Sequence, residues 1–133
     1  MTPWFADTFF FIALLSRTDT AHEAAVEFSK RLSPGLLTTH WVLTEVADAM
    51  AEPSRRSRFV ELLGFLRSNP RVSIIDTDRE LFDRGVERYA ARLDKPWSLT
   101  DCISFVVMEQ YGVREALTGD HHFEQAGFVA LLK

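Results

Sequence analysis

The sequence of 133 residues lacks the features that would indicate a disulfide-stapled or membrane-spanning protein. Its single cysteine, Cys102, excludes an internal disulfide and fits a reducing compartment. The longest early apolar run, residues 9–15, is too short to cross a bilayer. An acid precedes this run, whereas a signal peptide begins with basic residues. We therefore expect a cytoplasmic protein that does not associate with a membrane.

Basic residues are outnumbered, with 15 Lys and Arg against 19 Asp and Glu, and the formal net charge is −4. Such a chain has no general attraction to nucleic acid, so a polyanionic substrate would require metal ions or a local basic patch. No internal repeat, low-complexity tract or linker divides the sequence. We expect a single domain over residues 1–133, long enough to bury a core without staples.

Short apolar runs alternate with patterns typical of helices. Strands are expected at residues 3–6, 36–39, 71–75, 115–118 and 128–132. Helices are expected at residues 8–16, 20–32, 41–50, 54–67 and 77–93, from residue 98 onward, and as one turn at 123–126. Three of these helices begin with a capping-box motif, at Thr20–Glu23, Thr77–Glu80 and Ser98–Asp101. Strands separated by helices predict an α/β fold with a parallel sheet covered on both faces.

Four acids are expected at the carboxyl edge of this sheet. Asp7 ends the first strand, Asp120 follows the fourth, and Asp101 lies in the first turn of the most apolar helix. Glu45 lies in the second turn of the helix that follows the second strand. Parallel α/β sheets carry their working residues at this edge, so the four carboxylates are candidates for one site.

Each acid also has a structural explanation. Asp101 fits the third position of a capping box begun by Ser98, Asp7 fits a helix cap, and Asp120 fits a turn. Glu45 is the hardest to explain in this way, because its charge lies among buried positions. Grouped carboxylates raise one another's pKa values, and a hard divalent cation such as Mg²⁺ or Mn²⁺ removes that conflict. Such ions activate water for attack on a phosphodiester, so the implied chemistry is hydrolysis of a nucleic-acid backbone or another phosphoester.

Four segments resemble a known family in order and spacing: FADTFFFIALL, TTHWVLTEVADAM, WSLTDCISFVVMEQYG and EALTGDHHFEQAGF. Together they are similar to the motifs of the PIN-domain ribonucleases, above all the VapC-like toxins and their solitary relatives. The resemblance covers residues 5–128, and the two C-terminal motifs are its most specific part.

The resemblance implies a three-layer α/β/α sandwich with a five-stranded parallel sheet and Mg²⁺- or Mn²⁺-dependent cleavage of RNA. It assigns Asp7, Glu45, Asp101 and Asp120 as the metal-binding, catalytic acids, and it places the hydroxyls of Thr8 and Thr118 beside the site. Family members commonly form homodimers, and a small antitoxin protein holds the toxins inactive. Gly119 departs from the bulkier residue common there, and its backbone freedom is expected to shift Asp120 slightly.

Other polar residues have two interpretations each. Arg55, Arg56 and Arg58 are candidates for binding the RNA backbone, because guanidinium groups pair with phosphates, or they belong to a solvated helix face. The hydroxyl of Ser98 either caps its helix or touches a metal-bound water. His121 and His122 are expected to be neighbours of the metal site and not its core, because adjacent histidines disfavour binding one ion together.

One imidazole of this pair is a candidate for contacting a substrate phosphate or fixing Asp120. The sequence thus predicts a metal-dependent endoribonuclease. The alternative is a catalytically inactive module that binds RNA or protein on the same fold. A phosphatase or receiver domain fits less well, because no second aspartate follows Asp7 in a DxD motif and no lysine other than Lys133 lies near the fifth strand.

Overall fold

The computed structural model describes residues 2–133 and contains a five-stranded sheet in which every neighbouring pair of strands is parallel. The strand order is β3-β2-β1-β4-β5, with β1 in the centre. The strands are β1 (Trp4–Ala6), β2 (Leu36–Thr39), β3 (Val72–Ile75), β4 (Glu115–Leu117) and β5 (Val129–Ala130). The predicted five-stranded parallel sheet is confirmed.

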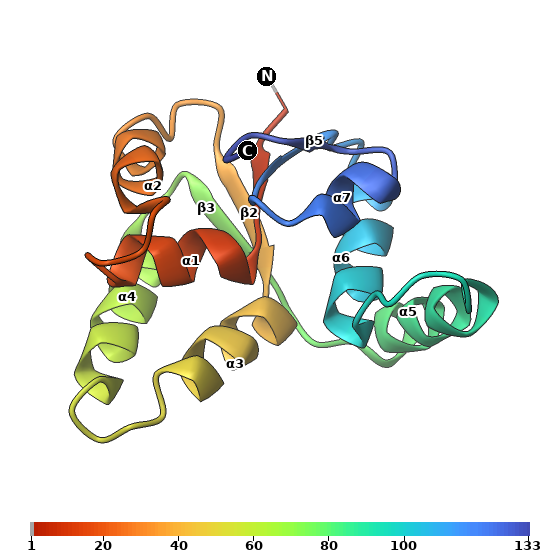
Figure 1. Ribbon diagram of the computed structural model, residues 1–133, viewed down its shortest axis with the longest axis horizontal. Helices are drawn as coiled ribbons and strands as arrows, with labels where there is room; N and C mark the ends of the chain where they lie inside the picture. The colour runs from red at the N-terminus through yellow and green to blue at the C-terminus, as the bar shows by residue number, and fades with distance from the viewer. Residues whose placement is uncertain (1) are drawn as a thin grey trace.

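Helices cover both faces of the sheet. Figure 1 shows α1–α4 on one side and α5–α7 on the other, which is the expected α/β/α sandwich. The helices are α1 (Thr8–Leu15), α2 (His22–Ser29), α3 (His40–Ala49), α4 (Arg56–Ser68), α5 (Arg79–Ala91), α6 (Leu99–Gln110) and α7 (His121–Gln125). In the part of the chain that the structure describes, no helix is long and apolar enough to cross a membrane.

The core lies where the central strands meet the most apolar helices. Phe5 and Ala6 of β1 are fully buried, and so is the whole of β2. This places two threonine hydroxyls in the core. The hydroxyl of Thr39 accepts from the N–H of Val42 at 3.1 Å, and that of Thr38 donates a hydrogen bond to the carbonyl oxygen of Ala6 at 2.9 Å. A buried hydroxyl without such a partner would cost free energy, so the bond fixes β2 beside β1.

Helices α5 and α6 pack against each other through a glycine. A Cβ atom built at Gly85 would lie 2.3 Å from Cγ1 of Ile103 and 3.3 Å from its Cα atom. Only a residue without a side chain allows this approach. The close packing holds α6 firmly, and α6 carries Asp101 in its first turn.

The strand order creates a crevice beside β1. From β1 the chain moves through β2 to β3 on one side, and it then crosses to β4 and β5 on the other side. Loops that leave the carboxyl ends of β1 and β4 therefore diverge to opposite faces of the sheet, which is where open α/β sheets bind ligands. Asp7 directly follows β1, and Asp120 lies three residues beyond β4.

Two of the three predicted capping boxes are wrong. Helix α2 begins only at His22, and its N-cap, Ala21, makes no side-chain capping bond. Asp19 instead forms a turn before the helix, with its Oδ1 accepting a hydrogen bond from the backbone N–H of Ala21 at 2.8 Å. At α5 the cap is Asp78, whose Oδ1 accepts from the N–H of Leu81 at 3.1 Å. In both places a nearby aspartate competes with the threonine for the free N–H groups.

The C-terminal elements also differ from the prediction. Helix α7 begins at His121 and not at Phe123, so both histidines lie in its first turn. Strand β5 is limited to Val129 and Ala130 at the edge of the sheet. The helix starts earlier because Asp120 caps it, which places the histidines next to the carboxyl edge of β4.

Candidate active site

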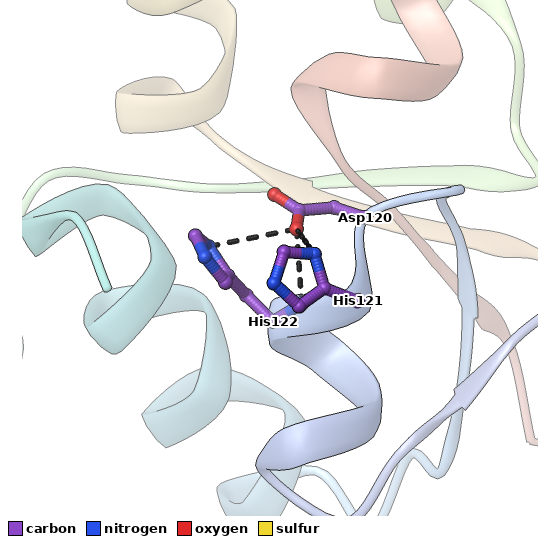
Figure 2. A group of neighbouring side chains, drawn as sticks. All are labelled: Asp120, His121 and His122. Atoms are coloured by element: carbon purple, nitrogen blue, oxygen red, sulfur yellow. Dashed lines mark hydrogen bonds and ion pairs between the residues drawn. The ribbon is translucent and has the colours of Figure 1, made fainter. Parts of the chain in front are cut away.

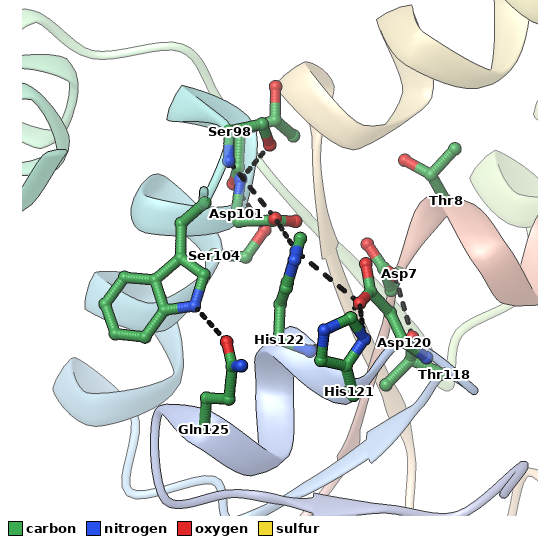
Figure 3. Close-up of polar contacts among 12 residues, drawn as sticks. Asp7, Thr8, Ser98, Asp101, Ser104, Thr118, Asp120, His121, His122 and Gln125 are labelled. Carbon is green, nitrogen blue, oxygen red and sulfur yellow. Dashed lines mark hydrogen bonds and ion pairs between the residues drawn. The ribbon is translucent and has the colours of Figure 1, made fainter. Parts of the chain in front are cut away.

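Asp7 lies at the floor of the crevice, between β1 and α1. Its side chain is only 5% exposed, and its Oδ2 accepts a hydrogen bond from the hydroxyl of Thr118 at 2.9 Å. Asp7 is the N-cap residue of α1 by backbone geometry but makes no side-chain capping bond. Its carboxylate is thus free of the structural role that the sequence offered as an alternative, and Figure 3 shows it beside Asp120.

Asp101 comes from the opposite wall, in the first turn of α6. Here the predicted capping box is confirmed: the N–H of Asp101 donates to Oγ of Ser98 at 3.0 Å, and the N–H of Ser98 donates to Oδ2 of Asp101 at 3.3 Å. The Asp101 residue is 8% exposed. The cap accounts for one carboxylate oxygen and leaves the other, so capping and a functional role are compatible.

Asp120 is fixed between β4 and α7. Its N–H donates to the hydroxyl of Thr118 at 3.0 Å, and its Oδ1 accepts from the N–H of His122 at 2.9 Å. Thr118 therefore connects Asp120 to Asp7 through one hydroxyl group. Figure 3 shows the two carboxylates next to each other above Thr118.

Gly119 has a packing role that the sequence did not indicate. Its φ is not positive, so the position does not require the conformational freedom of glycine. A Cβ atom at this position would instead lie 2.5 Å from Cζ of Phe9. The ring of Phe9 occupies the space that a side chain at residue 119 would need, and the glycine accommodates that ring beside Asp120.

Glu45 reaches the site from α3. The hydroxyl of Thr8, the residue after Asp7, donates to Oε1 of Glu45 at 2.6 Å. This bond connects the first turn of α1 to the second turn of α3 across 37 positions of sequence. Glu45 is half-buried, and its donor Thr8 directly follows Asp7 in the sequence.

Burial and the neighbouring acids disturb the ionisation of Asp7 and Asp101. Burial raises the pKa of Asp7 to about 7 from 3.8, the charges of Asp101 and Asp120 add to the increase, and the hydrogen bond from Thr118 opposes it. Burial also raises the pKa of Asp101, against the lowering effect of its hydrogen bond with His122. Within residues 2–133 no Lys or Arg forms an ion pair with any of the four acids. The site is short of positive charge.

The remaining oxygens suit a hard divalent cation. Oε2 of Glu45, Oδ1 of Asp101 and Oδ2 of Asp120 have no hydrogen bond from the described residues. None of them is a fully buried atom without a partner, so each reaches solvent. Carboxylate oxygens of this kind are the ligands that Mg²⁺ and Mn²⁺ prefer, and Mg²⁺ needs only one or two of them because it retains water. The donor set thus fits such an ion.

The histidine pair lies closer together than the sequence suggested. Figure 2 shows both rings beside Asp120, and one ligand atom from each of Asp120, His121 and His122 lies within 4.8 Å of the other two. Adjacency therefore does not keep the two imidazoles from approaching the same point, while their expected place outside the ligand core stays a prediction. Helix α7 begins at His121, and its first turn allows neighbouring side chains to turn toward the same cap residue.

The candidate arginines lie away from the acids, near the start of α4. Arg55 pairs with Glu52 at 3.4 Å, and Nε of Arg56 donates to the carbonyl oxygen of Ala51 at 2.6 Å. Arg55 and Arg58 line a cavity of about 1100 Å³ together with Arg17 and His22. This cavity lies at the C-terminal end of α1, which is about 12 Å long, whereas Asp7 precedes its N-terminal end.

One contact in the site could not be read from the sequence. Nδ1 of His122 lies 3.1 Å from Oδ2 of Asp101, and the imidazole stands between α6 and α7 (Figure 3). A second bond joins the same two segments, from Nε1 of the buried Trp97 to Oε1 of Gln125 at 3.0 Å. No local pattern signals either contact, because each depends on how α7 packs against α6.

Comparison with known proteins identifies relatives of this chain. The curated relatives include the 23S rRNA-specific endonuclease VapC20 of Mycobacterium tuberculosis, in two strains, each 28% identical over 127 residues that cover 94% of this chain and 95% of the relative. The crystal structure of M. tuberculosis VapC20, described as a toxin that cleaves the sarcin-ricin loop, superposes with a TM-score of 0.86 at 25% identity and covers 96% of this chain and 97% of that one.

A second solved structure shares the fold at lower identity. It is VapBC2 from Rickettsia felis bound to a DNA fragment from its promoter, with a TM-score of 0.67 at 12% identity, covering 96% of this chain and 95% of that one. The family model of the PIN domain matches residues 5–129, which is nearly the whole chain. The sheet order, the acids at its carboxyl edge and this match together show that the chain belongs to the PIN-domain family.

Proposed function

We propose that this chain is an endoribonuclease that hydrolyses RNA phosphodiester bonds with Mg²⁺ or Mn²⁺ held by its acidic cluster. The observation that carries the proposal is the convergence of three aspartates from β1, α6 and the β4–α7 loop without a Lys or Arg partner in residues 2–133. The similarity to a 23S rRNA-specific endonuclease over most of both chains supports RNA, and structured ribosomal RNA in particular, as the substrate.

Some residues of the site would hold the metal ion, and others orient the acids that hold it. Asp7, Asp101 and Asp120 would hold the ion, with Glu45 completing the pocket. Thr118 orients Asp7, and Thr8 orients Glu45 through bonds of 2.9 and 2.6 Å. A bound divalent ion would lower the pKa of a water molecule and neutralise charge on the phosphate. Burial of Asp7 limits its access to bulk water, which strengthens its interaction with a cation.

The test is cleavage of ribosomal RNA fragments with Mg²⁺, with Mn²⁺ and with EDTA. Asp7→Asn and Asp101→Asn should each abolish metal-dependent cleavage while circular dichroism remains that of the native chain, because asparagine keeps the shape but loses a charged ligand. Asp48→Asn is the matched control: this exposed acid lies on α3 one turn from Glu45, outside the cluster. Unchanged cleavage by both site variants would refute the proposed mechanism.

A catalytically inactive module that binds RNA or protein remains the rival function. It would be supported if the purified chain bound RNA but cut none with either metal present. Thr8 and Thr118 each bond to one oxygen of an acid and leave the other oxygen free for a metal ion. This arrangement favours an enzyme over a binding module, because binding RNA or protein does not require free carboxylate oxygens.

We also propose that the protein acts in the cytoplasm as the toxin of a toxin–antitoxin pair and forms a homodimer. The similarity to VapC20, named as a toxin, and to a chain of the VapBC2 structure supports the toxin–antitoxin assignment. Growth arrest on expression of the chain, relieved by a small protein encoded beside it, would establish the pairing. Light scattering of the purified chain would give the oligomeric state.

A further inference from the structure

The side chain of His122 is the only imidazole of the pair that touches two of the acids. Its Nδ1 lies 3.1 Å from Oδ2 of Asp101 and 3.5 Å from Oδ1 of Asp120, and the side chain is 18% exposed. An ionised carboxylate can only accept a hydrogen bond, so Nδ1 of His122 carries the hydrogen in the shorter contact. Figure 3 shows the ring between the two acids.

His122 contacts oxygens that are already engaged. Oδ2 of Asp101 also accepts from the N–H of Ser98, and Oδ1 of Asp120 also accepts from the N–H of His122 itself. The opposite oxygens, Oδ1 of Asp101 and Oδ2 of Asp120, have no hydrogen bond from residues 2–133. The imidazole therefore bonds to Asp101 and lies 3.5 Å from Asp120 without taking the oxygens that a metal ion would use.

The two acids need such a connection because different parts of the chain carry them. Asp101 lies on α6, and Asp120 lies in the loop before α7, 19 positions later. Their negative charges raise each other's energy, and without the imidazole between them each carboxylate is held only by one backbone N–H. Hydrogen-bonded partners of metal ligands commonly fix ligand orientation in this way.

We propose that His122 is a positioning residue of the metal site, which orients Asp101 for the ion through its Nδ1–H and lies against Asp120, without binding the ion itself. The proposal rests on the function proposed above. His121 is the natural comparison: its side chain is 60% exposed, its Nδ1 lies 3.6 Å from Oδ1 of Asp120, and it has no contact with Asp101 among the described residues.

The experiment is Mn²⁺ titration of the full chain, with free Mn²⁺ measured by electron paramagnetic resonance. His122→Ala should weaken Mn²⁺ binding about 10- to 100-fold, as expected for loss of a partner of metal ligands. His122→Asn, whose amide can donate from near the position of Nδ1, should recover part of the affinity. His121→Ala should stay within about threefold of the parent chain. Thermal unfolding in EDTA would confirm that the variants are folded.

The outcomes are separable. If the parent chain and Asp101→Asn bind Mn²⁺ equally weakly, the metal site of the proposed function fails, whatever His122 does. If the parent binds and His122→Ala binds equally well or more tightly, the positioning role is overturned. Hyperfine coupling of bound Mn²⁺ to an imidazole nitrogen that disappears in His122→Ala would make His122 a direct ligand and also overturn it. An equal loss in His121→Ala would assign the ion to the pair of histidines instead.

Discussion

Replacing Asp7 with asparagine should stabilise the metal-free protein at neutral and alkaline pH. Burial and the neighbouring acids raise the pKa of Asp7 to about 7 in the folded state, whereas the usual value of 3.8 applies when the chain is unfolded. Between these two values the folded state binds the proton more tightly than the unfolded state does. The free energy of unfolding of the parent chain should therefore decrease as the pH rises from 4 to 7.

The size of the effect follows from the two pKa values. A difference of about 3 between them, at 1.36 kcal/mol each, corresponds to about 4 kcal/mol. Asparagine resembles the protonated acid and does not titrate. The stability of Asp7→Asn minus that of the parent should be near zero at pH 4 and increase by at most about 1.4 kcal/mol per pH unit. It should level off at about 4 kcal/mol above pH 7.

Urea unfolding in EDTA at pH 4, 5, 6, 7 and 8 measures this difference directly. Groups far from Asp7 titrate alike in both proteins, so their contributions cancel. Addition of Mn²⁺ at about 100 times its dissociation constant should restore about 2.7 kcal/mol to the parent alone, because only the parent retains the ligand. Asp48→Asn, an exposed change on α3, should stay within about 0.5 kcal/mol at every pH. A difference that does not depend on pH, or a less stable Asp7→Asn at pH 8, would refute the reasoning.

Two glycine substitutions test the packing around the site. Gly85→Ala should destabilise the fold by about 1–3 kcal/mol in urea unfolding, because its methyl group would collide with Ile103. Gly64→Ala, on an open helix face, should be neutral or stabilising by up to about 1 kcal/mol. Similar losses in both variants would contradict this account. Gly119→Ala should lower Mn²⁺ affinity by displacing the ring of Phe9 beside Asp120, and adding Phe9→Leu should recover part of it. Failure of the double variant to recover would show that the collision is not the cause.

The strands and the acids were predictable because each depends on local signals. A short run of apolar residues that ends in an aspartate is visible without neighbours, as at β1 and Asp7. A parallel sheet then brings the carboxyl ends of separate strands to one edge. Acids that follow different strands therefore lie close together although they are far apart in the sequence. The same reasoning located Asp101, whose capping box with Ser98 has no competing aspartate nearby.

The helix starts that were predicted wrongly have a common cause. A threonine followed three residues later by glutamate is a capping signal, but it does not exclude a better acceptor next to it. Asp78 lies one residue beyond Thr77 and captures the N–H of Leu81. The motif therefore predicts that a helix begins in the region. Which residue caps the helix depends on which side-chain acceptor is best placed to bind the free N–H groups.

The arrangement of the acids, in contrast, depends on contacts that no window of sequence contains. Thr8 reaches Glu45 across 37 positions, His122 reaches Asp101 across 21, and Thr118 reaches Asp7 across 111. Each of these donors takes one oxygen of an acid. A carboxylate held on one side keeps its other oxygen in a fixed direction, and a cation then binds without first ordering the ligands. The family resemblance can therefore place Thr8 and Thr118 beside such a site, but which acid each donor binds is set only when the helices and loops that carry them are packed.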